Sequence, residues 1–211
     1  MGTENEYKVV LLGEGRVGKT SLILRYVHDK FNDRLDRTVN ASYLTKTVAL
    51  GMKRVDLAIW DTAGQEMFHA LGPLYYRDSQ GAILVYDITD EDSFRKVKNW
   101  VKELKKMLGN EVVLVVIGNK SDLESERSVP LHEAESYAKS VGAAHFLTSA
   151  KLNRGITEVF LHLCKEMIMK RARDGARRQS TGAGAQRNRL QVETSDDNAE
   201  PTRTNKCCSL I

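Results

Sequence analysis

Residues 13–20 read GEGRVGKT, and they fit the pattern G-x-x-x-x-G-K-[S/T] at every fixed position. An apolar run, Tyr7–Gly13, precedes this stretch, and a helix-forming segment, Ser21–Val27, follows it. A phosphate-binding loop needs this order of strand, loop and helix, because the loop N–H groups and the helix N-terminus must face the same anion. Residues 7–27 therefore predict a nucleotide-binding protein of the α/β class.

The residue types in this loop predict how it binds phosphate and metal. Lys19 supplies a mobile cation to the β- and γ-phosphates, and the hydroxyl of Thr20 is placed to ligate Mg²⁺. The glycines let the backbone wrap around phosphate oxygens. The nucleotide-binding residues predicted in this stretch are Gly15, Arg16, Val17, Gly18, Lys19, Thr20 and Ser21.

Apolar runs alternate with helix-period segments along the rest of the chain. Gly81–Ile88 and Val112–Gly118, like Tyr7–Gly13, are nearly continuous Val, Leu and Ile, which is typical of central strands covered on both faces. Apolar residues recur at helical spacing in Asp92–Leu108 and in Ile156–Met167, which predicts two helices packed on the sheet. This alternation predicts an α/β fold with a mostly parallel sheet.

Two further strands are predicted to form a hairpin. Tyr43–Leu50 and Arg54–Trp60 mix polar and apolar positions, and a short connection centred on Gly51 joins them. Mixed patterns of this kind are typical of antiparallel strands that are partly exposed. The hairpin therefore places one antiparallel strand at an edge of the sheet.

A second motif predicts the base of the nucleotide. Asn119-Lys120-Ser121-Asp122 directly follows the apolar run 112–118. An ionised carboxylate only accepts hydrogen bonds, and guanine offers two adjacent donors, whereas adenine presents an acceptor at the corresponding ring nitrogen. Asp122 is therefore predicted to select guanine, with Asn119 and Lys120 in the same site.

A third motif, WDTAGQE at residues 60–66, carries the groups that hydrolysis requires. Asp61 is positioned to hold Mg²⁺ through a water molecule, and the Gly64 N–H can reach the γ-phosphate. The Gln65 amide can donate to that phosphate and accept from an attacking water. An ordinary turn would not explain these roles together, so Gln65 is the predicted catalytic residue.

The composition predicts one folded domain and a polar tail. Among the 211 residues, no apolar run reaches the roughly 18 residues that a membrane-spanning helix needs. Residues 171–211 carry eight Lys or Arg and five Asp or Glu, which is +3 of the net charge of +4. We therefore expect a nearly neutral domain without a nucleic-acid-binding face, followed by a disordered tail. The polar, acidic start lacks a secretory pattern, which predicts folding in the cytosol.

The motifs GEGRVGKT, WDTAGQE, NKSD and Ser149-Ala150-Lys151 resemble those of Ras-superfamily small GTPases, and within them the Rab family. Residues 68–73 and 87–94 are most similar to the endosomal subgroup of Rab proteins. The resemblance extends from Tyr7 to about Lys170. It implies a P-loop NTPase G domain at 1–171, with a six-stranded mostly parallel sheet, one antiparallel edge strand and helices on both faces. A hypervariable tail follows at 172–211.

The resemblance implies further nucleotide-binding residues. Phe31 would stack on the guanine base, and Thr38 would ligate Mg²⁺ only when the γ-phosphate is present. Ser149, Ala150 and Lys151 would support the guanine, chiefly through the Ala150 N–H. The resemblance accordingly implies GTP or GDP as the bound nucleotide, together with Mg²⁺.

The resemblance also implies an aromatic effector surface. Tyr43, Trp60 and Tyr75 match the three aromatic residues through which Rab proteins contact their effectors. Burial at a strand end is an alternative explanation for Trp60, because strand ends commonly bury such rings.

The end of the chain resembles a lipid attachment site. Cys207 and Cys208 resemble the paired cysteines of Rab double geranylgeranylation sites, Cys208 alone also fits a loose C-a-a-X pattern, and two unmodified thiols remain the alternative. Two lipids matter physically, because a single chain anchors a protein only marginally.

By the same resemblance the chain would be a monomer that cycles between the cytosol and the cytoplasmic face of intracellular membranes, early endosomes in particular. Its partners would be an exchange factor, a GTPase-activating protein, effectors on switches I and II, an escort protein and a GDP-dissociation inhibitor.

Four residues depart from the usual Rab pattern: Tyr43 replaces Phe, Asn40 replaces Gly, Arg37 replaces a small residue, and Met67 replaces Arg. None of them is a predicted phosphate or metal ligand, so they affect partner identity rather than nucleotide chemistry. Arg34 and Arg37 are not expected to act as arginine fingers, because a long loop does not preorganise a guanidinium. We expect a GTPase-activating partner to supply that group.

Two other functions share part of this pattern. A P-loop kinase or ATPase would also use the phosphate loop. However, Asp122 contradicts adenine binding, and the sequence shows no segment for a lid over a second substrate. A scaffold that binds GTP without hydrolysing it is disfavoured by intact Gly15 and Gln65. The sequence therefore predicts a GTP-hydrolysing molecular switch in vesicle or endosomal membrane traffic.

Overall fold

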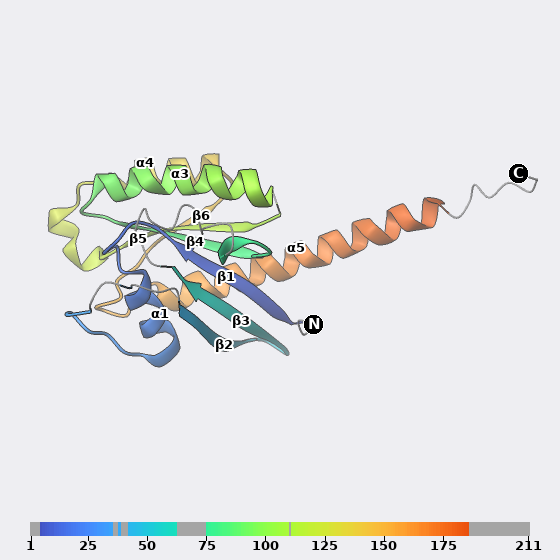
Figure 1. The fold of residues 1–211 in the computed structure, drawn as a ribbon, viewed down its shortest axis with the longest axis horizontal. Coiled ribbons are helices and arrows are strands. Elements are labelled where there is room, and N and C mark those ends of the chain that lie inside the picture. Colours follow the sequence, from blue (N-terminus) through green and yellow to red (C-terminus); the bar gives the residue numbers. More distant parts are fainter. Residues whose placement is uncertain (1–4, 36–37, 39–41, 63–74, 110, 186–211) are drawn as a thin grey trace, which may run out of the picture. The chain divides into compact units, whose positions relative to one another are not determined.

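The computed structural model describes residues 5–35, 38, 42–62, 75–109 and 111–185. The chain divides into two units, residues 1–172 and 173–211, and the sheet lies in the first. The described part of that unit forms a six-stranded sheet of order β2-β3-β1-β4-β5-β6 (Figure 1). Its strands are β1 (Glu6–Leu12), β2 (Ser42–Leu50), β3 (Lys53–Asp61), β4 (Gly81–Asp87), β5 (Val113–Asn119) and β6 (Ala144–Leu147).

The strand pairing confirms the predicted α/β fold class. Strands β3, β1, β4, β5 and β6 run parallel, and β2 pairs with β3 antiparallel at the edge. The predicted central strands coincide with β1, β4 and β5, and the predicted hairpin with β2 and β3. All seven residues of β4 are buried, as expected for a strand that is covered on both faces.

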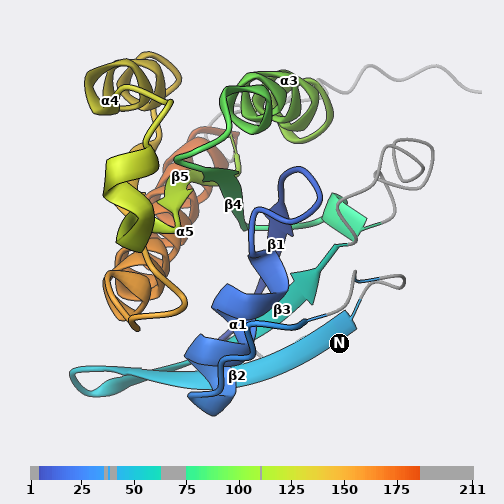
Figure 2. The same cartoon turned by 90° about the vertical axis from the view of Figure 1, so that its left-hand side faces the viewer.

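Helices cover both faces of the sheet (Figure 2). Helix α1 (Lys19–His28) and the first part of α5 (Ile156–Ala185) pack on one face, where the Tyr26 and Phe160 rings stack 3.7 Å apart. Helices α3 (Glu91–Leu108) and α4 (Leu131–Ser140) pack on the other face. The two apolar layers bury both faces of the sheet, so the loops at the ends of the strands extend from a packed core.

Helix α3 shows how the local sequence sets the bounds of an element. The Asp90 carboxylate accepts hydrogen bonds from the backbone N–H groups of Asp92 and Ser93, at 2.9 and 3.3 Å, and so caps the first turn. Gly109, with a φ of 65°, ends the helix. The residues buried at helical spacing between these ends are Phe94, Val97, Val101 and Leu104. The structure confirms the helix predicted at 92–108.

Helix α4 and strand β6 have no counterpart among the residue ranges predicted above. Helix α4 buries only Ala134 and Ala138, and all four residues of β6 are half-buried. Both elements therefore lack the strong apolar pattern from which the other elements are predicted.

Helix α5 continues to Ala185, which contradicts the predicted disorder for residues 172–185. Ala, Arg and Gln, which have high helix propensity, make up eight of the fourteen residues of that segment. The remainder of the predicted tail, 186–211, lies outside the described residues. Neither α5 nor any other helix in the described part of the chain is long and apolar enough to span a membrane.

The strand order provides a crevice for a ligand. In the sheet, β1 lies between β3 and β4, so the chain moves to opposite sides of β1 as it forms these two strands. In open α/β sheets, ligands bind at such a reversal, outside the carboxyl ends of the strands. The three motifs of the sequence lie where β1, β3 and β5 end, so the fold brings them together at the carboxyl ends of the parallel strands (Figure 1).

Strand β5 reaches this edge through a glycine that has no room for a side chain. A Cβ atom on Gly118 would lie 2.6 Å from the Tyr86 hydroxyl oxygen and 3.0 Å from Cδ2 of Leu147. The Tyr86 hydroxyl is also hydrogen-bonded to Nε2 of His145 at 3.1 Å. Gly118→Ala should therefore lower the free energy of unfolding by about 1–3 kcal/mol in urea titrations.

Two further variants control this prediction. Adding Tyr86→Phe to Gly118→Ala should restore only part of the lost stability, because the hydroxyl oxygen is gone while the ring carbon Cζ, 2.8 Å from the Cβ position, remains. Gly175→Ala makes the same change in a helix where nothing lies within 4 Å of the new methyl, and it should not destabilise the protein. A Gly118→Ala protein as stable as the parent would contradict the packing described here.

Candidate functional site

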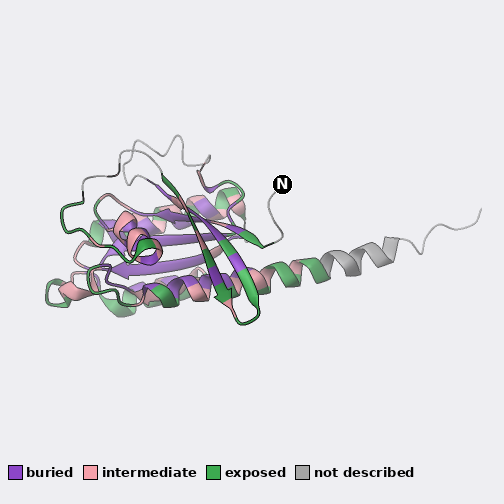
Figure 3. Cartoon of the chain, turned by 90° about the horizontal axis from the view of Figure 1, so that it is seen from below, coloured by how far each residue is buried: buried purple, intermediate pink, exposed green. Residues whose placement is uncertain are grey.

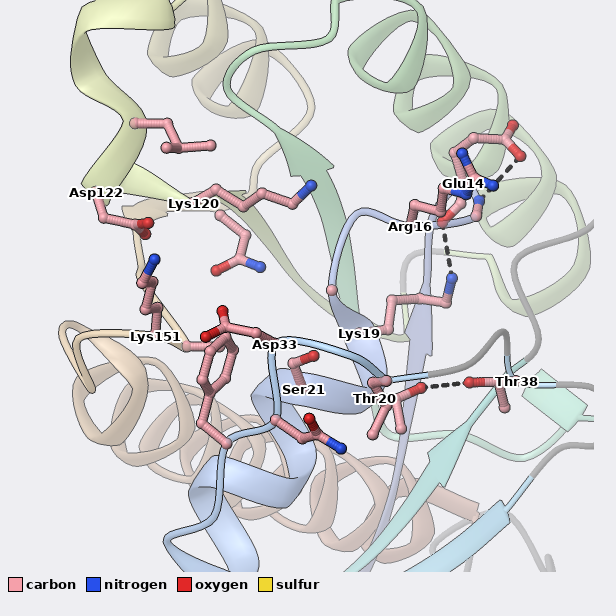
Figure 4. A pocket seen from close by; sticks show the side chains of 18 residues that line it. Glu14, Arg16, Lys19, Thr20, Ser21, Asp33, Thr38, Lys120, Asp122 and Lys151 are labelled. Atoms are coloured by element: carbon pink, nitrogen blue, oxygen red, sulfur yellow. Dashed lines mark hydrogen bonds between the residues drawn. The ribbon is translucent and has the colours of Figure 1, made fainter.

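A cavity of about 690 Å³ lies at the carboxyl ends of the strands, within the size range of small-molecule sites. Figure 4 shows Asp122, Lys120 and Lys151 toward one end of it and Lys19, Thr20 and Thr38 toward the other. The residues predicted from the sequence that line it are Gly15, Arg16, Gly18, Lys19, Thr20, Ser21, Phe31, Thr38, Asn119, Lys120, Asp122, Ala150 and Lys151. The fold thus gathers side chains from four loops around one space.

Two glycines let the 13–18 loop follow its path between β1 and α1. A Cβ atom on Gly13 would lie 2.2 Å from the backbone oxygen of Val85 in β4. Gly18 has a φ of +94°, and a Cβ atom there would lie 2.5 Å from Nδ2 of Asn119. Gly18 also occupies the N-cap position of α1 without a capping side chain, so the first N–H groups of that helix remain for an anion.

Lys19 is buried at the phosphate end of the cavity. Its Nζ donates hydrogen bonds to the backbone oxygens of Gly13 and Glu14, at 2.8 and 2.9 Å. Burial lowers the pKa of Lys19 to about 8, while the carboxylates of Asp61 and Glu14 act in the opposite direction. An incoming phosphate would add negative charge beside this ammonium group and stabilise its protonated form.

Three side-chain oxygens converge next to Lys19. Thr20 Oγ1 donates to Asp61 Oδ2 at 2.6 Å, and Thr38 Oγ1 lies 2.6 Å from the same Thr20 oxygen. Asp61 is fully buried, and its second oxygen, Oδ1, has no hydrogen-bond partner among the described residues. Burial raises the pKa of this carboxyl, against the opposing effects of the Thr20 hydrogen bond and the Lys19 charge.

This group of oxygens fits Mg²⁺. The ion prefers oxygen ligands, and at nucleotide sites proteins usually supply only one or two of them besides the phosphates. A bound cation would also compensate the unpartnered Oδ1 of Asp61, which is costly to bury alone. The described ranges contain no group of three or more His, Cys, Asp or Glu residues that could hold a metal ion.

The opposite end of the cavity presents an oriented carboxylate. Ser149 Oγ donates to Asp122 Oδ1 at 2.5 Å and accepts the backbone N–H of Leu152 at 3.0 Å. Ser149 is fully buried and does not line the cavity, whereas Asp122 does. The structure therefore places Ser149 behind Asp122, where it holds the carboxylate in a fixed orientation.

Asn119 connects three segments of the site. Its Nδ2 donates to the backbone oxygen of Val17 at 2.8 Å, and its Oδ1 accepts from Thr148 Oγ1 at 3.1 Å. These bonds tie the phosphate loop to β5 and to the segment that carries Ser149. Val17 itself is 1% exposed and does not line the cavity, so within this site it can offer only its backbone.

Three residues that the sequence interpretation missed support the base end. Arg25 on α1 donates from Nε to the Ala150 oxygen at 3.0 Å, and its guanidinium lies 5.8 Å from the centre of the Phe31 ring. Asp87 pairs with Lys120 Nζ at 2.5 Å, and Thr148 supports Asn119. Of these three residues, only Asp87 could have been found from the sequence, because it ends a buried apolar run and ligands bind at the carboxyl ends of such strands.

Glu14 links the phosphate loop to helix α3. One carboxylate oxygen lies 3.0 Å from Lys96 Nζ, and the other accepts the Gly15 N–H at 3.0 Å. This arrangement turns a negative side chain within the loop toward a cation.

The sequence interpretation also missed three residues of the loop after Phe31 that line the cavity, namely Asn32, Asp33 and Leu35.

Several predicted functional residues lie outside the described residues. They include Gly64 and Gln65 of the third motif, Cys207 and Cys208, and the three departures Arg37, Asn40 and Met67. Arg34 is described; it is exposed and does not line the cavity.

The three predicted effector aromatics lie next to one another. Tyr43 and Trp60 are directly opposite on β2 and β3, with ring centres 5.2 Å apart, and Tyr75 lies 6.2 Å from Trp60. Tyr43 is 50% exposed, while Trp60 is half-buried and has Lys8 Nζ 5.2 Å from the centre of its ring. Trp60 is therefore neither a wholly buried core ring nor a free surface ring.

Comparison with known proteins places this site in a family. The sequence model of the Ras family matches residues 8–169. Ras-related protein Rab-21 of Mus musculus is 62% identical over 211 residues, which cover 99% of this chain and 94% of that protein. Rab-21 of Homo sapiens is 61% identical over 99% of this chain and 93% of that protein, and Rab-21 of Dictyostelium discoideum 53% over 98% of each. The chain therefore belongs to the Ras family of small GTPases and, within it, to the Rab GTPases that act as switches in vesicle traffic.

Proposed function

We propose that the cavity binds GTP with its guanine at Asp122 and its phosphates at Lys19, with Mg²⁺ held beside Thr20. The observation that carries this proposal is the arrangement of the cavity, which has an oriented carboxylate at one end and a buried cation with converging oxygens at the other. A carboxylate matches the adjacent donors of guanine, and a cation beside helix N–H groups matches a polyphosphate.

The residues at the phosphate end would lower the barrier to water attack on the γ-phosphate. Lys19 would stabilise charge on the β- and γ-phosphates, and its burial strengthens that interaction. Thr20, Thr38 and Asp61 would hold Mg²⁺, which supplies charge neutralisation at the phosphates when bound. Gln65 would orient the attacking water, and a GTPase-activating partner would supply an arginine.

The contact between Thr20 and Thr38 suggests how the site would act as a switch. Thr38 belongs to the segment between α1 and β2, and its hydroxyl reaches the phosphate loop. We propose that GTP and Mg²⁺ hold this segment in place and that hydrolysis releases it. Strand β2 follows the same segment and carries Tyr43, so effectors that bind Tyr43, Trp60 and Tyr75 could respond to the nucleotide.

We propose membrane attachment through geranylgeranyl groups on Cys207 and Cys208 and action at early endosomes. The G domain at 1–171 would bind nucleotide, and the segment from 172 onward would join it to the lipids. The chain would act as a monomer with an exchange factor, a GTPase-activating protein, effectors, an escort protein and a GDP-dissociation inhibitor as partners. The relationship to Rab-21 proteins and the paired terminal cysteines support this proposal.

Chelation of Mg²⁺ tests the proposed site directly. EDTA should accelerate the release of a fluorescent GDP analogue at least tenfold, because the phosphates would lose a shared cation. Asp61→Asn should release GDP faster than the parent in Mg²⁺ and respond less to EDTA, whereas Asp78→Asn, at an exposed carboxylate, should behave as the parent. Release that is unaffected by EDTA in the parent would contradict the proposed metal site.

A further inference from the structure

A second cavity, of about 430 Å³, lies between the β2–β3 turn and helix α5 in the first unit. We call it the hairpin pocket. Val55, Ile168 and the nearly buried Tyr7 contribute apolar atoms to it. Among the described residues that line it, the charged ones are the cations Lys53, Arg54 and Arg171. The hairpin pocket is therefore a cavity that is partly lined by apolar atoms and has positively charged residues at its rim.

The residues at the rim are accessible from outside. Gly51, with a φ of 61°, allows the tight turn between β2 and β3, and the next residue, Met52, is fully exposed. Lys53, Arg54 and Arg171 are exposed as well, and Figure 3 shows this end of the hairpin coloured as exposed. The Arg171 guanidinium lies 5.5 Å from the centre of the Tyr7 ring, which gives one of the cations a defined position.

The hairpin pocket is separate from the nucleotide cavity. Strands β1 and β3 run parallel, with their amino ends at Glu6 and Lys53 and their carboxyl ends at Leu12 and Asp61. Seven residues of extended strand span about 20 Å. A surface that covered the hairpin pocket would thus leave uncovered the nucleotide cavity, which lies at the carboxyl ends of the strands.

We propose that the hairpin pocket docks the folded domain on an anionic membrane, with a phosphorylated lipid headgroup among its cations and Met52 entering the interface. The inference rests on the proposed attachment of the chain to membranes. Among the described residues, three cations and no carboxylate line the hairpin pocket, which matches an anionic surface. One isolated apolar side chain at a turn suits shallow insertion, whereas a stable protein interface would need a larger apolar area.

The test uses the full 211-residue chain prepared without lipid modification, so that lipid anchors do not contribute. Vesicle flotation is compared for neutral phosphatidylcholine, for a mixture with phosphatidylserine, and for a mixture of equal charge with a phosphorylated inositol lipid. We expect little binding to the neutral vesicles and the tightest binding to the phosphorylated lipid, because only its phosphates can enter the hairpin pocket.

Paired variants separate the hairpin pocket from general charge effects. Lys53→Glu/Arg54→Glu should lower vesicle partitioning at least tenfold, because each cation near an anionic surface accounts for about fivefold. Arg95→Glu/Lys102→Glu makes the same charge change at exposed positions of α3, on the other face of the sheet, and should change partitioning less than threefold. Met52→Ser should lower partitioning severalfold without changing charge.

Three results would overturn the proposal. Equal losses in the two charge-reversed chains would show that net charge alone controls binding. If the chain bound a soluble inositol phosphate as tightly as it binds vesicles, the hairpin pocket would be a site for free phosphate and not for a membrane. Unchanged vesicle binding by Lys53→Glu/Arg54→Glu, with loss of organelle association in cells, would indicate an acidic protein partner instead.

Nucleotide binding, measured on the same samples, keeps the two proposals distinguishable. All variants should retain the affinity of the parent for GDP, because none of the substituted residues lines the nucleotide cavity. A parent chain that binds no guanine nucleotide would refute the proposed function, whatever the vesicles show.

Discussion

Asp122→Asn should lower the affinity for GTP by about 10²- to 10⁴-fold and raise the affinity for xanthosine triphosphate. Ser149 donates to this carboxylate and holds its orientation, and in the proposed site the carboxylate accepts from the two adjacent donors of guanine. Each hydrogen bond to a charged group contributes about 1.5–3 kcal/mol, and the substitution affects both of them. Xanthine carries a carbonyl in place of the exocyclic amine, and the amide nitrogen of Asn can donate to that oxygen.

Competition binding against a fluorescent GDP analogue measures this change in preference. Asp33→Asn is the matched control, because Asp33 also lines the cavity as a carboxylate but lies outside the Asn119–Asp122 motif from which base recognition is predicted. It should leave the ratio of GTP to xanthosine triphosphate affinities unchanged. If Asp122→Asn retained the GTP affinity of the parent, Asp122 would not be the residue that reads the base.

Gln65→Leu should leave GTP affinity within about twofold of the parent and lower GTPase-activating-protein-stimulated hydrolysis at least 10²-fold. Gln65 is proposed to orient the attacking water and to assist the transition state, so its loss affects the barrier rather than the bound nucleotide. Leu is similar in size but can neither donate nor accept a hydrogen bond. Single-turnover hydrolysis with an activating domain measures the rate.

Gln191→Leu makes the same chemical change in the C-terminal segment and should hydrolyse GTP as the parent does. The dissociation rate of GTP, measured for both variants, shows whether binding has changed. Parental stimulated hydrolysis by Gln65→Leu would mean that another group orients the water.

The sequence was sufficient to predict the parts of this fold that depend on strong local patterns. The buried runs became β1, β4 and β5, and the mixed strands became the β2–β3 hairpin. Helix α4 and strand β6 could not be predicted in this way, because each buries few apolar side chains. The helical backbone of 172–185 was missed as well, because this segment contains no Val, Leu, Ile, Met or Phe from which an apolar stripe could be predicted.

The same distinction applies to the candidate site, where residues in local motifs were predictable and residues that act through distant contacts were not. Lys19, Thr20 and Asp122 were predictable, because their chemistry follows from a local motif, and they line one cavity. Arg25 and Thr148 were not, because they act on residues far away in the chain, at Ala150 and Asn119. Contacts of that kind depend on how the helices and strands pack, which no short stretch of sequence encodes.

Single-turnover hydrolysis by the parent chain measures base selection and GTP turnover in one experiment. The protein is loaded with GTP or with ATP in the presence of Mg²⁺, and the bound nucleotide is followed with and without a GTPase-activating domain. We expect stable loading with GTP and not with ATP, slow conversion to GDP by the protein alone, and conversion at least 10³-fold faster with the activating domain. Stable loading with ATP, or GTP that remains intact with a competent activating domain, would contradict the assignment of this protein as a GTP-hydrolysing switch.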